Sequence, residues 1–337
     1  KAVVWADLFQ GSALIIGGAI TMVLCFIAVG GIGPFLETNA GKLHMILPRN
    51  HPVLPWTALV IGLWIPNFYY WGLTQFITQR TLAAKSLKEG QLGIIFAAFL
   101  KLSIPFIIIF PGIMATQLYK DQLTGTSDAA YPLLIRNLIP AGVRGFIFAA
   151  ISGAVISSLA SMLNSASTIF TIDLYQRHLK KNASAHSLVT IGRIMTLFFV
   201  IIGCLIAPQL GAGRFRGIFN YIQEFQGFIS PGRLAAFIFG LFVSRTPASA
   251  GVSSLLLSVL IYGILLVFFG NIAFLNRMAI TFVVLLIIMS IITLLKPLRE
   301  PKTMPVREDF DIQPSPVVKV LGTVVIAITI ILYIIFW

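Results

Sequence analysis

The sequence predicts an all-α, polytopic membrane protein, and three observations support that fold class. Of the 337 residues, 58% are hydrophobic and 10% are charged, whereas soluble domains carry about 25% charged residues. The apolar residues form runs long enough to cross a bilayer, and the mean hydropathy is +0.94. The basic residues collect in short connections between these runs, so the net charge of +13 indicates loops facing anionic lipid and no nucleic-acid partner.

We expect about nine membrane-spanning helices, because nine apolar runs are as long as a bilayer requires. The predicted spans cover residues 3–29, 56–80, 91–118, 142–174, 188–208, 218–243, 252–269, 278–295 and 317–337. The basic connections at 80–89, 177–181, 245 and 296–307 favour the cytoplasm. This pattern predicts Lys1 on the cytoplasmic side of the cell membrane and Trp337 on the outer side.

The fourth predicted span carries small and hydroxyl residues along one face. In a helix Ala154, Ser157 and Ser158 fall at i, i+3 and i+4 and therefore share that face. Such a stripe is costly in hydrocarbon unless it meets other helices or a cavity. Two interpretations stay open: close helix packing through small residues, which base rates favour, or an alkali-cation site built from hydroxyl and carbonyl oxygens.

The second predicted span combines a proline with amide and aromatic side chains. Pro66 removes a backbone donor and predicts a disturbed helix in mid-membrane. Asn67 follows at once, with Tyr70 and Trp71 close behind. Aromatic faces pack on the C–H surface of a sugar and amides hydrogen-bond its hydroxyls, which favours a carbohydrate site. The alternative is an aromatic packing cluster with ordinary hydrogen-bond partners.

Further polar residues lie inside other apolar spans. Asp7 is either an interfacial residue or part of an ion path. Lys101 lies about ten residues into the third span and is either functional or extends to an interface. Gln223 enters the sixth span, where the segment 227–232 predicts an interrupted helix of the kind that forms substrate sites in secondary transporters. The spans after residue 245 are almost uniformly apolar and predict scaffold.

No catalytic motif accompanies these residues. The sequence contains no HExxH, GxSxG, P-loop or Gly-rich dinucleotide turn. We therefore expect no enzyme and no cofactor, and a membrane protein that transports or binds a ligand.

Five blocks of the chain resemble the sodium/solute symporter family, in particular its sodium/sugar branch and the bacterial sodium/galactose symporters within it. They are IPNFYYWGLTQFITQRTLAAK at 65–85, SSLASMLNSAST at 157–168, FNYIQ at 219–223, FLKL at 99–102 and WAD at 5–7. The resemblance implies one transporter domain with an inverted-repeat core of five-plus-five helices that alternates access around a central site. It places residues 1–245 in the core and 246–337 in peripheral C-terminal helices.

The resemblance also implies roles for the residues of the substrate site. Asn67, Lys101 and Gln223 look like the polar contacts to the sugar. Tyr70 looks like the aromatic residue that stacks on the pyranose ring and forms the inner gate, with Trp71 beside it.

Coupling to sodium is implied in the same way. The Ala154 carbonyl and the Ser157 and Ser158 hydroxyls look like one wall of a Na⁺ site, and Asp7 looks like the acid on the sodium exit route. Two further residues are assigned to gating and structure: Tyr69 and Arg80.

Two departures from the family pattern bear on function. The chain has fewer spans than family members, so we expect an N-terminally incomplete fragment of a longer protein. Some relatives that couple two sodium ions carry a hydroxyl where this chain has Ala160, which predicts one Na⁺ per sugar.

The predicted function is sodium-coupled symport of a galactose- or glucose-like monosaccharide. The alternatives are another solute (myo-inositol, sialic acid, an amino acid or a carboxylate, which Lys101 could pair with) and a sugar sensor without transport.

Overall fold

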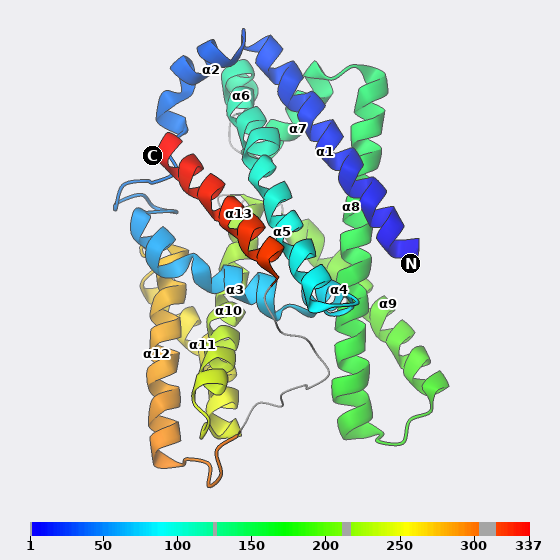
Figure 1. The fold of residues 1–337 in the computed structure, drawn as a ribbon, viewed down its shortest axis with the longest axis vertical. Coiled ribbons are helices and arrows are strands. Elements are labelled where there is room, and N and C mark those ends of the chain that lie inside the picture. Colours follow the sequence, from blue (N-terminus) through cyan, green and yellow to red (C-terminus); the bar gives the residue numbers. More distant parts are fainter. Residues whose placement is uncertain (1, 124–126, 211–216, 303–314) are drawn as a thin grey trace. The chain divides into compact units, whose positions relative to one another are not determined.

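The computed structural model describes residues 2–123, 127–210, 217–302 and 315–337, and every regular element in those ranges is a helix (Figure 1). Eight helices in these ranges are long and apolar enough to cross a membrane, so the prediction of a multi-pass membrane protein is confirmed. Many of their apolar side chains are exposed, for example Leu197 and Leu256, as expected of helices that face lipid. Lys1 and Arg307, which entered the prediction of sidedness, lie outside the described residues.

The chain forms two compact units, of which the first comprises Lys1–Leu43 and Phe96–Ile218. The boundary between the units falls within α5 (Leu87–Ile104), of which the part from Phe96 belongs to the first unit. The other helices of the first unit are α1 (Ala2–Ala28), α2 (Ile32–Asn39), the π-helical η3 (Pro105–Ile109), α6 (Phe110–Leu118), α7 (Ala130–Leu138), α8 (Ala141–Thr168), the π-helical η6 (Ile169–Leu179) and α9 (Ala185–Leu210). Helix α1 packs along α8 (Figure 1). At Gly153 a Cβ would lie 3.2 Å from the Cγ of Gln10, so the absence of a side chain allows the two helices to approach closely.

The core of the first unit lies where α1, α2, α6 and α7 meet. Cys25, Phe35, Met114 and Leu134 are fully buried there. The rings of Phe26 and Phe35 pack edge to face with their centroids 5.4 Å apart. This apolar cluster fixes one end of α1, the helix that carries Asp7.

Helix α7 is a short helix between α6 and α8. It follows a 3-10 turn at Ser127–Ala129. The Tyr131 hydroxyl donates a hydrogen bond to the Ile107 carbonyl at 3.4 Å, and burial raises the pKa of its phenol. The short helix is therefore anchored to η3 by a partly buried side chain.

The second unit comprises His44–Ile95 and Phe219–Trp337. Its helices are the π-helical η2 (Ala58–Gly62), α3 (Trp64–Leu73), α4 (Gln75–Leu82), α10 (Ile218–Phe242), α11 (Ala248–Phe268), α12 (Phe274–Leu295) and α13 (Pro316–Ile335). Helices α10, α11 and α12 lie side by side (Figure 1). Ile65, Leu234, Ala250 and Leu285 form one core cluster, so α3 packs against this three-helix group.

The second predicted span, 56–80, is divided into η2, α3 and α4, so it is not among the eight candidate spans found in the described residues. The Leu63 N–H bonds to the Ala58 carbonyl at 2.8 Å, and this wide turn ends just before Pro66. Because the π turn absorbs the change in hydrogen-bond register, the chain stays helical through the proline. The helix ends instead at Thr74, which is extended with φ −91° and ψ 123°.

Helix α10 also continues where an interruption was predicted, through Pro231. The Ser258 hydroxyl of α11 accepts the Gly232 N–H at 3.1 Å and donates to the Phe228 carbonyl at 2.8 Å. These are the two groups that an α-helix pairs with each other. The Ser254 hydroxyl donates to the Gly232 carbonyl at 3.0 Å. Hydroxyls of a neighbouring helix thus satisfy the backbone around the proline, and the helix persists.

Candidate functional site

The contact between α1 and α8 joins two residues predicted for the sodium path. The Ser157 hydroxyl donates a hydrogen bond to a carboxylate oxygen of Asp7. These residues are 150 positions apart in the chain, so the fold alone brings them together. Because the hydroxyl donates its hydrogen in this bond, the lone pairs of its oxygen remain available to a cation.

The remainder of the stripe on α8 divides into an accessible and a buried part. Ala154 is half-buried and Ser158 is exposed. Two to three turns further on, Ser165 and Ser167 are each only 5% exposed. Helix packing therefore explains Ser165 and Ser167, whereas Asn164 and Thr168 are exposed, and the N-terminal end of the stripe keeps hydroxyl oxygen accessible beside Asp7.

Asn67 lies half-buried on α3, the helix predicted to carry sugar contacts. Its Nδ2 donates to the Leu63 carbonyl at 2.8 Å, one helical turn earlier. That bond orients the amide and leaves its Oδ1 as an acceptor for a ligand hydroxyl.

Tyr70 and Trp71 lie at the end of α3, next to the break at Thr74. The two rings pack edge to face with centroids 5.2 Å apart, and Tyr70 makes a second edge contact with Phe76 at 5.8 Å. The Thr74 hydroxyl donates to the Tyr70 carbonyl. Trp71 is 46% exposed. The aromatic group is thus partly a packing cluster, as the alternative interpretation held, and partly an accessible ring surface.

The remaining predicted residues are divided between the units. Gln223 lies half-buried on α10, in the same unit as α3, and Lys101 lies on α5 in the first unit. The Arg233 guanidinium of α10 lies 5.7 Å from the centroid of the Tyr69 ring, which joins α3 to α10. Arg80 lies in the last turn of α4, where a cation is favourable to the helix dipole.

Comparison with known proteins assigns this arrangement to a family. Residues 1–258 match the sodium:solute symporter family. This chain belongs to that family. Its members are transporters that use Na⁺ as the coupling ion.

Several relatives of this chain are informative. It is 42% identical over 286 residues to a sodium/glucose cotransporter of Vibrio parahaemolyticus, a match covering 77% of this chain and 52% of the relative. It is 35% identical over 328 residues to the uncharacterised symporter YidK of Escherichia coli, covering 95% of this chain and 57% of the relative. It is 35% identical over 293 residues to a sodium/myo-inositol cotransporter 2 of Sus scrofa, covering 77% and 43%. The chain therefore spans about half the length of these relatives.

The fold is shared with a solved symporter structure. A Na⁺-coupled sialic acid symporter, described in a substrate-bound, outward-open state, superimposes with a TM-score of 0.73 at 24% sequence identity. The match covers 90% of this chain and 63% of that one. The prediction of a secondary-transporter fold is confirmed.

The chain also contains a largely buried group that the sequence interpretation missed, the arginine network of Glu224, Tyr262 and Arg277. Arg277 of α12 pairs with Oε1 of Glu224 on α10. The Tyr262 hydroxyl of α11 donates to Oε2 of the same carboxylate at 2.7 Å. The predicted eighth span began at residue 278, so Arg277 was left just outside it, whereas α12 begins at Phe274. An arginine inside a span is the signal that would have identified it.

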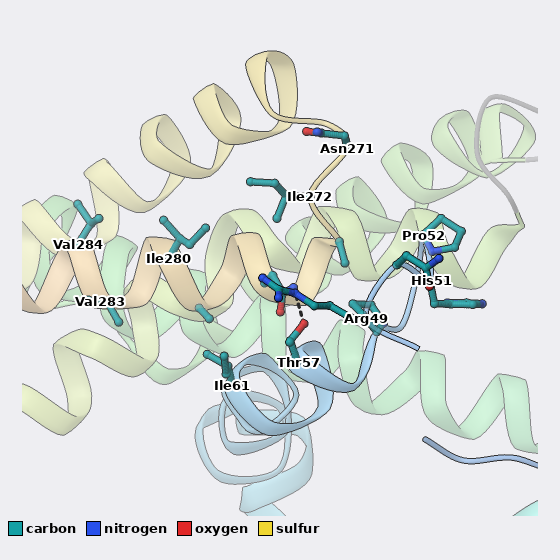
Figure 2. A pocket seen from close by; sticks show the side chains of 15 residues that line it. Arg49, His51, Pro52, Thr57, Ile61, Asn271, Ile272, Ile280, Val283 and Val284 are labelled. Carbon is teal, nitrogen blue, oxygen red and sulfur yellow. Dashed lines mark hydrogen bonds between the residues drawn. The ribbon is translucent and has the colours of Figure 1, made fainter. Parts of the chain in front are cut away.

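A cavity of about 650 Å³ lies in the second unit beside the N-terminal end of α12 (Figure 2). Figure 2 shows Ile280 and Val283 of α12 facing Ile61 of η2 across it. The Asn276 amide donates to the Thr57 hydroxyl at 3.0 Å, which ties the start of η2 to α12. None of the residues predicted to bind sugar or sodium lines this cavity, so it is separate from the candidate site.

Proposed function

We propose that this chain belongs to a sodium-coupled symporter that carries a monosaccharide, such as galactose or glucose, across the cell membrane by alternating access. The observation that carries the proposal is the hydrogen bond from Ser157 to Asp7, beside the exposed Ser158, in a sodium:solute symporter chain. The similarity to a sodium/glucose cotransporter supports the substrate class.

The proposed sodium site uses the N-terminal part of the stripe on α8. The Ser157 and Ser158 hydroxyls and the Ala154 carbonyl form one wall of it, since oxygen ligands suit a hard cation. A carbonyl oxygen has two lone pairs, so Ala154 can serve its helix and a cation at the same time. The charge of Asp7 makes the approach and exit of the cation less costly.

The proposed sugar site uses the end of α3 together with two residues from other helices. The Asn67 Oδ1 accepts a sugar hydroxyl, and the faces of Tyr70 and Trp71 cover the C–H surface of the ring. Lys101 and Gln223 supply further hydrogen bonds to hydroxyls. Tyr69 and Arg80 have gating and structural roles.

Coupling follows from a shared conformational equilibrium. We place residues 1–245 in an inverted-repeat core and 246–337 in peripheral helices, within a single transporter domain. Sodium stabilises the outward-open state, which raises the affinity for sugar, and the sugar raises the affinity for sodium by the same factor.

Uptake by the whole protein that carries this sequence tests the proposal. In proteoliposomes an inward Na⁺ gradient is expected to drive accumulation of radiolabelled galactose or glucose, and an equal K⁺ gradient is not. Equal uptake with both ions would refute sodium coupling. A sugar-evoked conductance without accumulation would favour a sensor instead.

The flux ratio and the sidedness are tested in the same preparation. Because Ala160 lacks a hydroxyl, we expect one ²²Na⁺ to enter with each sugar, and a ratio of two contradicts this. With Lys1 in the cytoplasm, a cysteine replacing Trp337 is expected to react with an impermeant thiol reagent added outside intact cells. Reaction only after permeabilisation reverses the orientation.

A second candidate substrate is a carboxylate or a cyclic polyol. Lys101 lies within an apolar helix and can pair with a carboxylate, and the relatives include a myo-inositol cotransporter and a sialic acid symporter. Competition against labelled sugar by myo-inositol, sialic acid and amino acids separates these candidates. Stronger inhibition by one of them than by unlabelled galactose and glucose would assign that substrate.

A further inference from the structure

The arginine network crosses three helices of the second unit in a buried setting. Arg277 is 2% exposed and Tyr262 is fully buried. The Arg277 guanidinium pairs with Glu224 and lies 5.6 Å from the centroid of the Tyr262 ring. Both carboxylate oxygens of Glu224 are engaged, one by Arg277 and the other by Tyr262. The network therefore joins α10, α11 and α12 through a single carboxylate.

Such a network holds its geometry strongly. A buried charge that loses its partner is very costly, so Glu224 and Arg277 cannot separate without a penalty. Arg277 Nε is buried without a hydrogen-bond partner among the described residues, so the guanidinium is held in place through its other end. The guanidinium thus leaves one buried donor unpaired while its direction toward Glu224 is fixed. Positioning explains this arrangement better than stability alone.

The network fixes the rotation of α10 about its own axis. Successive residues on a helix are about 100° apart, so directing Glu224 toward α11 and α12 turns Gln223 onto a neighbouring face. Gly227, one turn after Glu224, lies so close to Tyr262 that a Cβ there would overlap the phenol ring. Two successive turns of α10 are therefore seated on the same tyrosine.

We infer that Glu224 and Arg277, with Tyr262, are positioning residues that set the rotation of α10 and so orient Gln223 toward the substrate. The substrate contact of Gln223 rests on the proposed function, whereas the seating of α10 does not. Helix α12, which the sequence predicted to be peripheral scaffold, thus supports a residue of the site from outside it.

Thiol labelling at position 223 tests the seating of α10 without any transport measurement. Gln223→Cys is made in a Cys204→Ser background, because Cys204 is exposed and Cys25 is buried. We expect its rate of reaction with an impermeant methanethiosulfonate reagent to rise at least about tenfold when Arg277→Gln is added, because Glu224 loses its cation and α10 leaves its seated position more often. Tyr262→Phe keeps the ring and is expected to give a rise of roughly threefold, and Arg245→Gln, at an exposed position, none.

Transport supplies the functional readout. In the variants with Gln223 intact, Arg277→Gln is expected to raise the KM for sugar roughly tenfold while the maximal rate changes little, because one ground-state contact is misplaced. Arg277→Lys, which keeps the charge, is expected to recover part of the affinity. Should Arg277→Gln fail to fold by size-exclusion chromatography, Tyr262→Phe decides the outcome.

The two hypotheses fail separately. Labelling rates and KM values that match the parent protein in a folded Arg277→Gln or Tyr262→Phe variant overturn the positioning role. A parent protein without sodium-dependent sugar uptake overturns the proposed function, while the labelling experiment still reports whether the network seats α10.

Discussion

The α1–α8 contact and the arginine network both place a carboxylate against hydroxyl groups inside membrane helices, and they differ in what remains accessible. At the first, Asp7 meets Ser157 beside an exposed Ser158. At the second, Glu224 has both oxygens engaged by fully or almost fully buried partners. A polar group with partners in the protein holds helices together, and one with accessible lone pairs is suited to a ligand.

This difference predicts where mutations act. Changes in the arginine network and around it are expected to reduce stability, whereas changes at the serine pair are expected to alter sodium binding at nearly constant stability.

The largest effect is expected from Arg277→Gln. The substitution leaves Glu224 partly buried without its cation, which should lower the free energy of unfolding by about 3–5 kcal/mol. Denaturant unfolding of the purified protein in detergent measures this. Arg245→Gln is the control, because Arg245 is exposed, and should change stability by less than about 0.5 kcal/mol. Equal stability of the two variants would mean that the network contributes no more than a surface charge.

Gly227→Ala is expected to have the next largest effect. Its Cβ would overlap the Tyr262 ring, so the helices must move apart at a cost of about 1–3 kcal/mol. Gly240→Ala on the same helix is the matched control, because no heavy atom lies within 4 Å of its Cβ. That control should be neutral or stabilising by up to about 1 kcal/mol, since alanine favours a helix. Equal stability of the two alanine variants would show that close packing of α10 on Tyr262 does not distinguish the arginine network from the rest of the helix.

Ser258→Ala is expected to cost about 1 kcal/mol, because the Phe228 carbonyl and Gly232 N–H lose the hydroxyl that bridges them but can partly pair with each other. Thermal unfolding measures the change, with Ser253→Ala on the same helix as control. A loss no greater than that of the control would show that the bridge is dispensable for α10.

Ser158→Ala is expected to have the smallest effect on stability, within about 0.5 kcal/mol, because the side chain is exposed. The same variant should raise the Na⁺ concentration for half-maximal uptake roughly tenfold, the equivalent of about 1.4 kcal/mol of lost coordination. Thr168→Ala, at the far end of the stripe, is the control and should leave sodium dependence unchanged. A sodium requirement that is the same in both variants removes Ser158 from the site.

The membrane class and most spans could be predicted because length and apolarity of a helix are local properties. The accessible and buried parts of the stripe on α8 could be placed on one face by periodicity, but their difference depends on the helices that pack there. The Ser157–Asp7 contact joins positions 150 residues apart, which no local pattern encodes.

The errors have physical causes as well. The disturbance predicted at Pro66 takes the form of a π turn just before it. The interruption predicted at 227–232 does not occur, because hydroxyls of α11 bond the backbone of α10 beside Pro231. Arg277 was missed because a predicted span was started at the first residue of an apolar run, whereas the helix begins earlier and buries the cation against Glu224.

Equilibrium binding of ²²Na⁺ to the purified protein, with and without sugar, tests the central claim of sodium–sugar coupling most directly. We expect galactose or glucose to lower the Na⁺ concentration for half-saturation, and Na⁺ to lower that for sugar by the same factor. Both shifts should disappear in the Ser157→Ala, Ser158→Ala double variant. Sodium binding that is unaffected by sugar, or shifts that persist in the double variant, would contradict the account.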